Sequence, residues 1–479
     1  MFDWSTLIIT LGTGTWLVLG IGTAGHALLY KREPSTALGW SLVCLLAPYF
    51  GALAYLAIGI NRIERRAQRF DLVSDEKLQK IPKDFKVQTS ELGASGKLFV
   101  SISDRIIKRP ILQGNHIAPF FTGETVFDSM LRDIQIAKSS ILLMTYIFRT
   151  DDIGRRFVKA LTEAKKRGVE VKVLIDGIGE RYTWPLPSDV LRTAGIDVCT
   201  FLSPRLFPPS FHLNLRNHRK LLIVDGSVAF TGGMNLGNQH LVDSSGNALT
   251  SDMHFRLTGP IVSQLTPVFS ADWRFAGGDY IKLIDYGNKV GLKDLTGDSW
   301  ARVITDGPDD DLGKLALVIN TAISAAKDSI RILTPYFLPN REMIAALKSA
   351  ALRGVEVEII LPEKSNLRVV DWATKNLLWE ILKWNVKVFY QPAPFAHTKL
   401  LIVDGSYVQI GSANLDPRSL RLNFELVVEI VDKTFAIDLE KHFKKILNSS
   451  RQTNLRELDA RSIFVRLRDS LAWLFSPYL

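Results

Sequence analysis

Cysteine is nearly absent from this chain, which has only Cys44 and Cys199 among its 479 residues. Two cysteines fit neither a disulfide framework nor a thiolate zinc site, so we expect both to be small apolar residues of the interior. Acidic residues are also scarce, because 49 Asp and Glu oppose 59 Lys and Arg and leave a formal net charge of +10. That charge favours an anionic partner, and nucleic acid, a membrane surface and a phosphate-bearing substrate all qualify.

Charged residues are missing from two long apolar runs near the N-terminus. Residues 4–30 and 34–60 contain no Lys, Arg, Asp or Glu, and each run is long enough to cross a bilayer as a helix. A signal peptide is the alternative for the first run, but no basic segment precedes it and a second apolar run follows at once. We therefore expect a transmembrane hairpin over residues 1–61, followed by a linker and approach helix over residues 62–115.

The distribution of basic residues predicts the orientation of this hairpin. Lys31 and Arg32 lie between the runs, whereas four arginines follow the second run. By the positive-inside rule, this places the remainder of the chain in the cytoplasm. The four residues are Arg62, Arg65, Arg66 and Arg69.

An internal repeat occupies most of the remaining sequence. Ala137–Ile141 is followed by Arg167–Leu174, and the closely similar Ala326–Ile330 is followed by Arg353–Ile360. In each copy a segment of helical periodicity alternates with a short Val- and Ile-rich run bounded by Gly or Pro. This pattern is typical of βαβ units and predicts an α/β fold.

Each copy of the repeat ends in the same motif, His-x-Lys-x4-Asp. It comprises His218, Lys220 and Asp225 in the first half, and His397, Lys399 and Asp404 in the second. The Leu-Leu-Ile-Val run inside each motif indicates a buried strand, and residues two apart along a strand point the same way. One such motif is weak evidence, but two in equivalent repeat positions indicate one shared site that places a nucleophile and a cation on a phosphate.

Each member of the motif also has a possible structural role. A lone His near a strand end is usually structural, but His218 and His397 each precede a lysine that is costly to bury unless an anion is nearby. We therefore assign the histidines and lysines to catalysis. Asp225 and Asp404 precede glycine, where aspartate commonly organises a turn, so we expect them to complete the motif as structural support.

Polar residues downstream of each motif are further candidates for the site. Asn235 and Asn414 can donate amide hydrogens to phosphate oxygens, and Ser412 can donate a hydroxyl, although Asn beside Gly is also a turn residue. Asp252 and Glu425 lie about thirty residues beyond the histidine of their own half, in strand-like sequence. A carboxylate there can hold an imidazole in one tautomer, with a surface salt bridge as the alternative.

These motifs resemble those of the phospholipase D superfamily, and the whole chain is similar to the bacterial cardiolipin synthases. The resemblance extends over nearly the full length, including the N-terminal apolar pair, Asn217–Lys220, Gly411–Ser419 and Asn423-x-Glu425. The second motif departs by reading Ala-His-Thr-Lys, a form that is usual at that place. The resemblance implies two pseudo-symmetric phospholipase D-like α/β domains, residues 116–290 and 291–450, each a mixed sheet flanked by helices.

The resemblance also implies the reaction. A phosphatidyl group would pass from one phosphatidylglycerol to another, giving cardiolipin and glycerol through a phosphatidyl-histidine, with His218 as nucleophile and His397 as acid and base. Lys220, Lys399, Asn235 and Asn414 would hold the phosphoryl oxygens, so neither a metal nor another cofactor is required. The expected partners are anionic phospholipid and the bilayer of the bacterial inner membrane, where the enzyme would be multi-pass.

The C-terminal segment 451–479 fits a membrane enzyme, since five apolar residues share one helical face there: Ile463, Phe464, Leu467, Leu471 and Leu474. Packing of this helix on the core is the alternative.

Two rival functions are compatible with parts of the sequence. A phospholipase D-type phosphodiesterase that hydrolyses phospholipid or nucleic acid would also explain the charge, but nucleic acid requires no apolar hairpin. A non-enzymatic membrane scaffold is the other class. The Asp-Gly-x2-Ala-Arg signature of synthases that use CDP-diacylglycerol is absent from the sequence.

Overall fold

The computed structural model describes residues 4–31, 34–59, 92–204, 215–242, 249–281, 297–308, 311–476 and 479. The chain forms two compact units, one of residues 1–66 with 205–211 and one of residues 67–204 with 212–479. Each unit is described by itself. The four arginines on which the predicted orientation depends, Arg62, Arg65, Arg66 and Arg69, lie outside the described residues.

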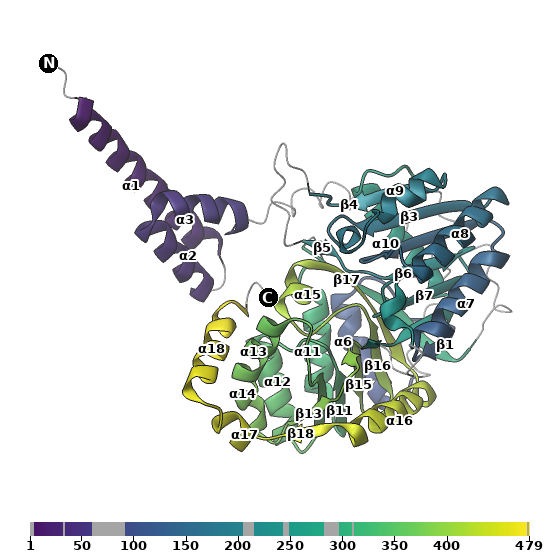
Figure 1. Cartoon of the computed structure of the whole chain (residues 1–479). Helices are drawn as coiled ribbons and strands as arrows, with labels where there is room; N and C mark the ends of the chain where they lie inside the picture. The colour runs from purple at the N-terminus through teal and green to yellow at the C-terminus, as the bar shows by residue number, and fades with distance from the viewer. Residues whose placement is uncertain are drawn as a thin grey trace. The chain divides into compact units, whose positions relative to one another are not determined.

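The first unit is helical (Figure 1). The first apolar run forms one helix, α1 (Trp4–Tyr30), as expected. The second run is divided into α2 (Pro34–Leu46), α3 (Pro48–Ala54) and a π-helix (Tyr55–Gly59), so the expectation of a single second helix is wrong. Pro48 explains the break, because proline has no N–H to continue the helix and is favoured at a helix start. Within the described part of the chain, no helix has both the length and the apolarity needed to span a bilayer.

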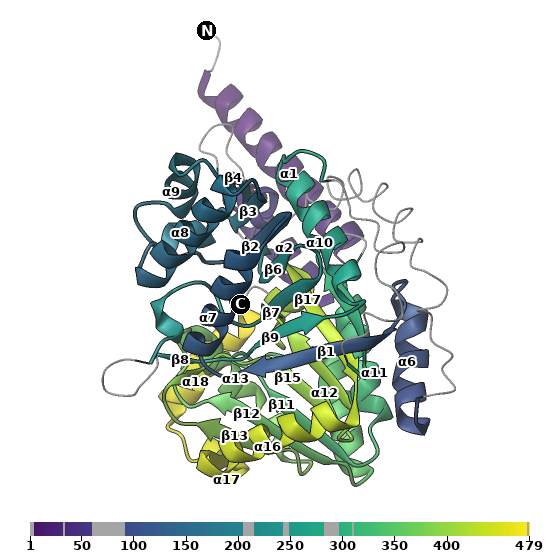
Figure 2. The same ribbon diagram turned by 90° about the vertical axis from the view of Figure 1, so that its right-hand side faces the viewer.

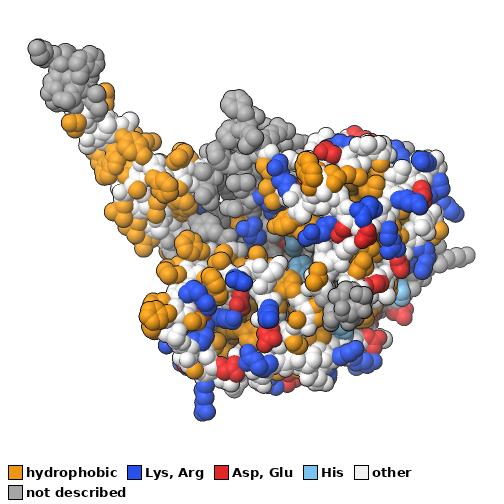
Figure 3. All heavy atoms as spheres, in the orientation of Figure 1, with side chains coloured by type: hydrophobic (Ala, Val, Ile, Leu, Met, Phe, Trp, Pro, Cys, Tyr) orange, Lys and Arg blue, Asp and Glu red, His pale blue; other side chains and the backbone are white. Residues whose placement is uncertain are grey.

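The small interior of this unit consists of Ala24, Ala27, Cys44 and Tyr55, which confirms the interior position expected for Cys44. Gly51 allows α3 to approach α2 closely, because a Cβ at this position would collide with the carbonyl group of Val43. Many other apolar side chains are exposed, and Figure 3 shows them covering the visible face of the helices.

The second unit is built on one mixed sheet with an approximate internal twofold. Its strand order is β18-β13-β12-β11-β15-β16-β17-β10-β1-β9-β7-β6-β2-β3-β4, with β5 paired to β17. The antiparallel pair β1 and β10 lies at the centre and joins the two halves. On either side the order of strand types repeats, with parallel pairs toward the outside. The sequence-based expectation of two α/β domains with a mixed sheet is confirmed.

The elements of the first half have the following bounds: β1 (Leu112–Phe120), α7 (Gly123–Ile136), β2 (Ser140–Thr145), α8 (Asp152–Lys166), β3 (Glu170–Asp176), α9 (Pro187–Thr193), β4 (Asp197–Phe201), β5 (Arg216–Asn217), β6 (Leu221–Val224), β7 (Val228–Gly232), β8 (Thr250–Ser251), β9 (His254–Thr258) and α10 (Val262–Phe275), with short 3-10 turns at Gly179–Tyr182 and Asn238–His240.

Those of the second half are β10 (Ser299–Asp306), α11 (Lys314–Ala325), β11 (Ser329–Leu333), α12 (Arg341–Leu352), β12 (Glu356–Pro362), α13 (Arg368–Leu377), α14 (Trp379–Leu382), β13 (Lys387–Gln391), β14 (Phe395–Ala396), β15 (Leu400–Val403), β16 (Tyr407–Gly411), α15 (Pro417–Arg421), β17 (Asn423–Val431) and α16 (Lys433–Ser449).

The repeated sequence has a local physical explanation. Asp151 and Asn340 cap the starts of α8 and α12, and each helix ends two residues before a glycine of positive φ, Gly168 or Gly354. The arginine before each glycine, Arg167 or Arg353, donates to a carbonyl oxygen near the end of the preceding helix. The following Val- and Ile-rich run then enters the core as β3 or β12.

Two elements fall outside the predicted domain limits. Helix α6 (Ala94–Ile106), within the predicted linker and approach helix, packs against α11 (Figure 2), and its buried residues include Phe99 and Val100. Strand β18 (Arg451–Thr453), within the predicted C-terminal segment, pairs with β13 at the sheet edge. Its three polar residues have no apolar alternation that would have predicted a strand.

The chain ends with α17 (Leu455–Asp459) and α18 (Ile463–Leu474). Helix α18 packs against α13 through Ala472 and Trp473. The five apolar residues predicted to share one face are all exposed, by between 55% and 80%. The five are Ile463, Phe464, Leu467, Leu471 and Leu474.

Candidate active site

Each motif histidine is held by a short strand pair between the two halves of the sheet. Strand β5 pairs in parallel with the start of β17, and the backbone N–H of His218 donates to the carbonyl oxygen of Phe424 at 2.9 Å. In the second half, β14 pairs in parallel with β8, and the N–H of His397 donates to the carbonyl oxygen of Ser251 at 2.8 Å. The two histidines therefore occupy equivalent places, each fixed by backbone from the opposite repeat.

The carboxylates that contact the imidazoles are also exchanged between the halves. Nδ1 of His218 lies 3.0 Å from Oε1 of Glu425, and Nδ1 of His397 lies 2.7 Å from Oδ2 of Asp252. Both carboxylates are buried, which leaves the histidines as their natural partners. Because an ionised carboxylate only accepts, each Nδ1 donates, and Nε2 keeps the lone pair that a nucleophile or base requires.

Burial controls the charge of the two imidazoles. Loss of solvent lowers the pKa of His218, and Lys220 adds to this effect, while Glu425 opposes it. Burial, with Lys399 next, lowers the pKa of His397 to about 3 against the opposing effect of Asp252. Both histidines are therefore neutral at neutral pH before an anion enters the site.

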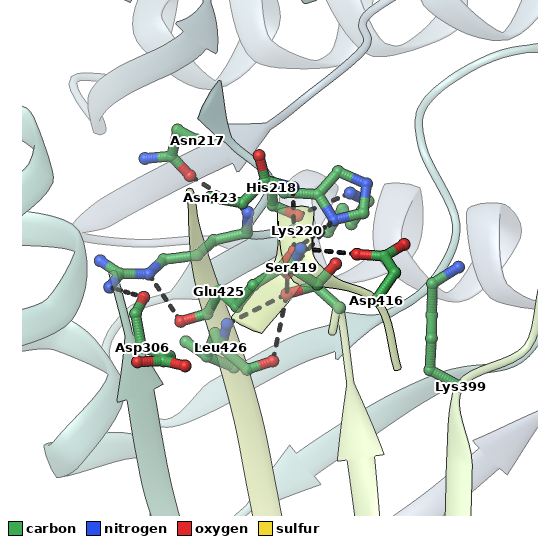
Figure 4. A network of polar contacts seen from close by, with 12 residues as sticks. Asn217, His218, Lys220, Asp306, Lys399, Asp416, Ser419, Asn423, Glu425 and Leu426 are labelled. Atoms are coloured by element: carbon green, nitrogen blue, oxygen red, sulfur yellow. Dashed lines mark hydrogen bonds and ion pairs between the residues drawn. The ribbon is translucent and has the colours of Figure 1, made fainter. Parts of the chain in front are cut away.

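The two motif lysines are buried beside the histidines. The ammonium group of Lys220 donates to the carbonyl oxygen of His218 at 2.6 Å, and that of Lys399 lies 2.8 Å from Nδ1 of His397. Burial lowers the pKa of Lys220 to about 7, helped by Lys399, and burial lowers the pKa of Lys399 to about 8. Lys399 also lowers the pKa of His218, which places the two halves of the motif in one electrostatic environment. Figure 4 shows His218, Lys220 and Glu425 together, with Asp416 and Lys399 beside them.

The residues predicted to contact phosphate have more varied surroundings. The amide oxygen of Asn235 accepts from the N–H of Ile147 at 3.2 Å, which leaves the amide NH2 group as the donor. The amide oxygen of Asn414 is buried and has no hydrogen-bond partner among the described residues. The hydroxyl of Ser412 donates to Oε2 of Glu425 and thus braces the carboxylate that holds His218.

The motif aspartates make contacts with a different loop in each half. Asp225 accepts hydrogen bonds from the backbone of Lys138, Ser139 and Ser140, which lead into β2. Asp404 does the same for residues 327–329, which lead into β11. Both aspartates have positive φ, 48° and 50°, in the turn before a glycine. Asp225 and Asp404 therefore fix the backbone where β2 and β11 begin.

Some residues near the histidines were not found from the sequence. The ring of Tyr146, at the end of β2, lies 5.3 Å from the ring of His218 and 5.5 Å from the ammonium of Lys220. Arg219 makes two hydrogen bonds to the buried Asp272 and a third to the carbonyl oxygen of Glu425. Arg219 is a member of the Asn-His-Arg-Lys motif, but its partner Asp272 lies 53 residues away in α10 and has no sequence signal.

Comparisons with known proteins identify the family of the chain. Residues 130–273 and 319–447 match the family described as "Cardiolipin synthase, PLD-like domain", and residues 16–59 match "Phospholipase_D-nuclease N-terminal". The chain is 33% identical over 466 residues to the major cardiolipin synthase of Bacillus subtilis, covering 94% of this chain and 95% of that protein. It is 32% identical to a cardiolipin synthase of Oceanobacillus iheyensis, covering 98% and 100%.

A solved structure shares the fold. The crystal structure of phosphatidylserine synthase from Haemophilus influenzae superimposes with a TM-score of 0.60 at 16% identity, covering 80% of this chain and 100% of that one. At this identity the likeness concerns the fold alone. Because the family match covers more than half of the chain, and the relatives match nearly all of it, the chain belongs to the cardiolipin synthase family of phospholipase D-like enzymes.

Proposed function

We propose that this protein makes cardiolipin by transferring a phosphatidyl group from one phosphatidylglycerol to the hydroxyl of another, with release of glycerol. The observation that carries the proposal is the pair of neutral imidazoles, each oriented at Nδ1 by a buried carboxylate of the opposite half and accompanied by a buried lysine. Membership of the family supports the same reaction, since its curated relatives are named cardiolipin synthases.

In the first step we assign His218 as the nucleophile. Its Nε2 attacks phosphorus, the bond from phosphorus to the glycerol oxygen breaks, and His397 gives that oxygen a proton. This role requires a protonated His397, whereas the pKa of His397 is about 3. An entering phosphodiester reduces the difference, because a negative charge beside the imidazole raises its pKa.

In the second step the roles reverse. His397 takes the proton from the primary hydroxyl of a second phosphatidylglycerol as that oxygen attacks phosphorus. The P–N bond to His218 breaks, and cardiolipin leaves. One phosphodiester replaces another, so the exchange requires no nucleotide.

The lysines and asparagines stabilise the charge that develops on phosphorus-bound oxygens. Burial deprives the ammonium groups of Lys220 and Lys399 of their usual hydration. A bound anion therefore stabilises their charged form. Asn235 and Asn414 would donate amide hydrogens. The contact between Ser412 and Glu425 suits a positioning role for this serine, in addition to the phosphate contact expected from its place in the sequence.

We further propose that the enzyme works at the bacterial cell membrane, with its catalytic unit in the cytoplasm. The uncharged N-terminal runs, their match to the N-terminal family and the basic residues that follow support a membrane-embedded hairpin. Within the catalytic unit, the exposed apolar face of α18 supports contact with lipid, because single apolar residues are common on surfaces but a continuous face is not (Figure 3).

The experiment that tests the proposal is incubation of the purified protein with phosphatidylglycerol alone, followed by mass spectrometry. We expect cardiolipin and glycerol in equal amounts. The variant His218→Asn should form neither, whereas His116→Asn, a change at an exposed position on β1, should behave as the parent. Phosphatidic acid as the lipid product would instead indicate a hydrolase, and cleavage of single-stranded DNA in a parallel assay would indicate a nuclease.

A further inference from the structure

Two arginines near the active site have no counterpart in the repeat. The catalytic groups occur twice, as one His, one Lys and one Asn from each half. Arg216 lies two residues before His218, but Phe395 occupies the equivalent place before His397. Arg418 follows Asn414 by four residues, but Gln239 occupies the equivalent place after Asn235. The bridges from Phe148 to Leu236 and from Phe337 to Leu415 support this register. Residues present once are not required by the duplicated chemistry, so another role must explain them.

The strand geometry directs Arg216 to the catalytic side of β5. Asn217 and Arg219 both donate to Asp272, at 2.9 and 2.7 Å, and therefore point to the side of α10. Alternation along an extended chain places Arg216 with His218 and Lys220 on the opposite side. The side chain of Arg216 is buried, with a 5% exposed fraction for the residue.

Arg418 approaches the same place from the second half. It belongs to α15, which leads directly into β17, and the first residue of β17, Asn423, pairs with Arg216. Arg418 is partly exposed. The two guanidinium groups are close enough for Arg418 to lower the pKa of Arg216, an effect that adds to the larger effect of burial.

The neighbouring carboxylates are engaged by backbone groups. Asp176 offsets part of the charge of Arg216, but its oxygens also accept the N–H groups of Ile178, Gly179 and Asn217. Asp416 accepts the N–H of Ser419 at 2.7 Å, and burial raises the pKa of Asp416 to about 7, so that it is partly neutral. This wall of the site therefore carries two guanidinium groups beside two carboxylates, one of which is partly neutral.

We propose that Arg216 and Arg418 form a second anion subsite, which binds the phosphodiester of the acceptor phosphatidylglycerol while its terminal hydroxyl reaches the reacting phosphorus. This proposal rests on the proposed function. It assigns selection of the second substrate to the two arginines. Guanidinium groups suit a phosphodiester because they donate two hydrogen bonds in a plane. The acceptor phosphate stays intact. Only the P–N bond to histidine breaks as the new P–O bond forms, and the hydroxyl proton passes to the other histidine.

The test compares two acceptors, one with a phosphate and one without. Cardiolipin formation uses phosphatidylglycerol as acceptor, whereas exchange of isotopically labelled glycerol into phosphatidylglycerol uses the same phosphatidyl-enzyme but an uncharged acceptor. Both rates are measured with full-length protein in detergent micelles. We expect Arg418→Gln to lower the ratio of cardiolipin formation to glycerol exchange by about tenfold or more, the effect of one lost charge-assisted hydrogen bond. Arg418→Lys should recover part of the ratio.

Arg421→Gln is the matched control, because Arg421 is on the same short helix, carries the same charge and is exposed. It should leave the ratio unchanged. Glycerol exchange also reports on folding, so a misfolded variant is recognised by the loss of both reactions together with a changed circular dichroism spectrum, and Arg418→Lys then decides. Equal loss of both reactions in a folded Arg418→Gln protein, or no change in the ratio, overturns the subsite. A parent protein that catalyses neither reaction contradicts the proposed function itself.

Discussion

Nδ1 of His397 lies 2.7 Å from Oδ2 of Asp252, although the two residues are 145 positions apart and belong to different repeats. The reciprocal contact joins His218 to Glu425 across 207 positions. Each half therefore supplies the group that orients the histidine of the other. Neither half by itself has a complete imidazole–carboxylate pair, which gives a physical reason for both repeats to be retained in one chain.

The contact between Asp252 and His397 predicts a large kinetic effect of a small change. In Asp252→Asn, the amide occupies the same space but carries no charge to stabilise the imidazolium of His397. We expect kcat for cardiolipin formation to fall by about 10²–10⁴-fold, with a much smaller change in KM, as measured by steady-state assay. Asp438→Asn, at an exposed position on α16, is the control. A KM effect without a kcat effect would contradict an orienting role for Asp252.

The nucleophile can be identified by trapping the covalent intermediate. Protein mixed with radiolabelled phosphatidylglycerol and quenched in base should retain label on His218, because a phosphoramidate resists base and is cleaved by acid. The variant His218→Asn should retain none. Peptide mapping that finds the label on His397 would reverse the assignment of the two histidines and leave the rest of the mechanism intact.

The motif aspartates should affect stability more than chemistry. Asp225→Ala removes the acceptor of backbone N–H groups from residues 138–140 and puts a Cβ without a hydrogen-bonding side chain at positive φ. We expect the unfolding free energy to fall by about 1–3 kcal/mol, as measured by thermal unfolding in detergent. The kcat per folded molecule should remain nearly unchanged. The same change at the exposed Asp438 should cost well under 1 kcal/mol. A large fall in kcat at unchanged stability would assign Asp225 to catalysis.

Anion affinity should depend on pH through the buried lysines. A bound phosphodiester favours the ammonium form and raises the pKa of Lys220 from about 7, so binding takes up a proton when the free lysine is neutral. Affinity is therefore full below pH 7 and falls as pH rises through 7, with Lys399 adding to the fall above about 8. Inhibition by glycerophosphoglycerol, whose single charge stays constant, measures this dependence.

Lys220→Met should bind this inhibitor more weakly and lose the part of the pH dependence that begins near 7. An inhibition constant that stays unchanged between pH 6 and 9 in the parent protein would mean that both lysines remain charged in the free protein.

The secondary structure and several candidate site residues could be predicted from the sequence alone, because both depend on local sequence patterns. Helical and strand periodicity in the repeat predicted the α/β elements, and the spacing of two predicted the common direction of His218 and Lys220. The position of Asp225 and Asp404 before glycine predicted a structural role, and their contacts with the loops that enter β2 and β11 agree with it. The apolar face of α18 was also readable from periodicity.

Only the tertiary structure decided how these parts meet. The crossed pairing of Asp252 with His397 and of Glu425 with His218 results from the short pairs β8 with β14 and β5 with β17, which depend on the closure of the whole sheet. The addition of β18 to the sheet edge likewise depends on packing. The low pKa values of Lys220 and Lys399 arise from burial, so the sequence by itself identified the candidate catalytic groups, whereas the folded environment determined their charge.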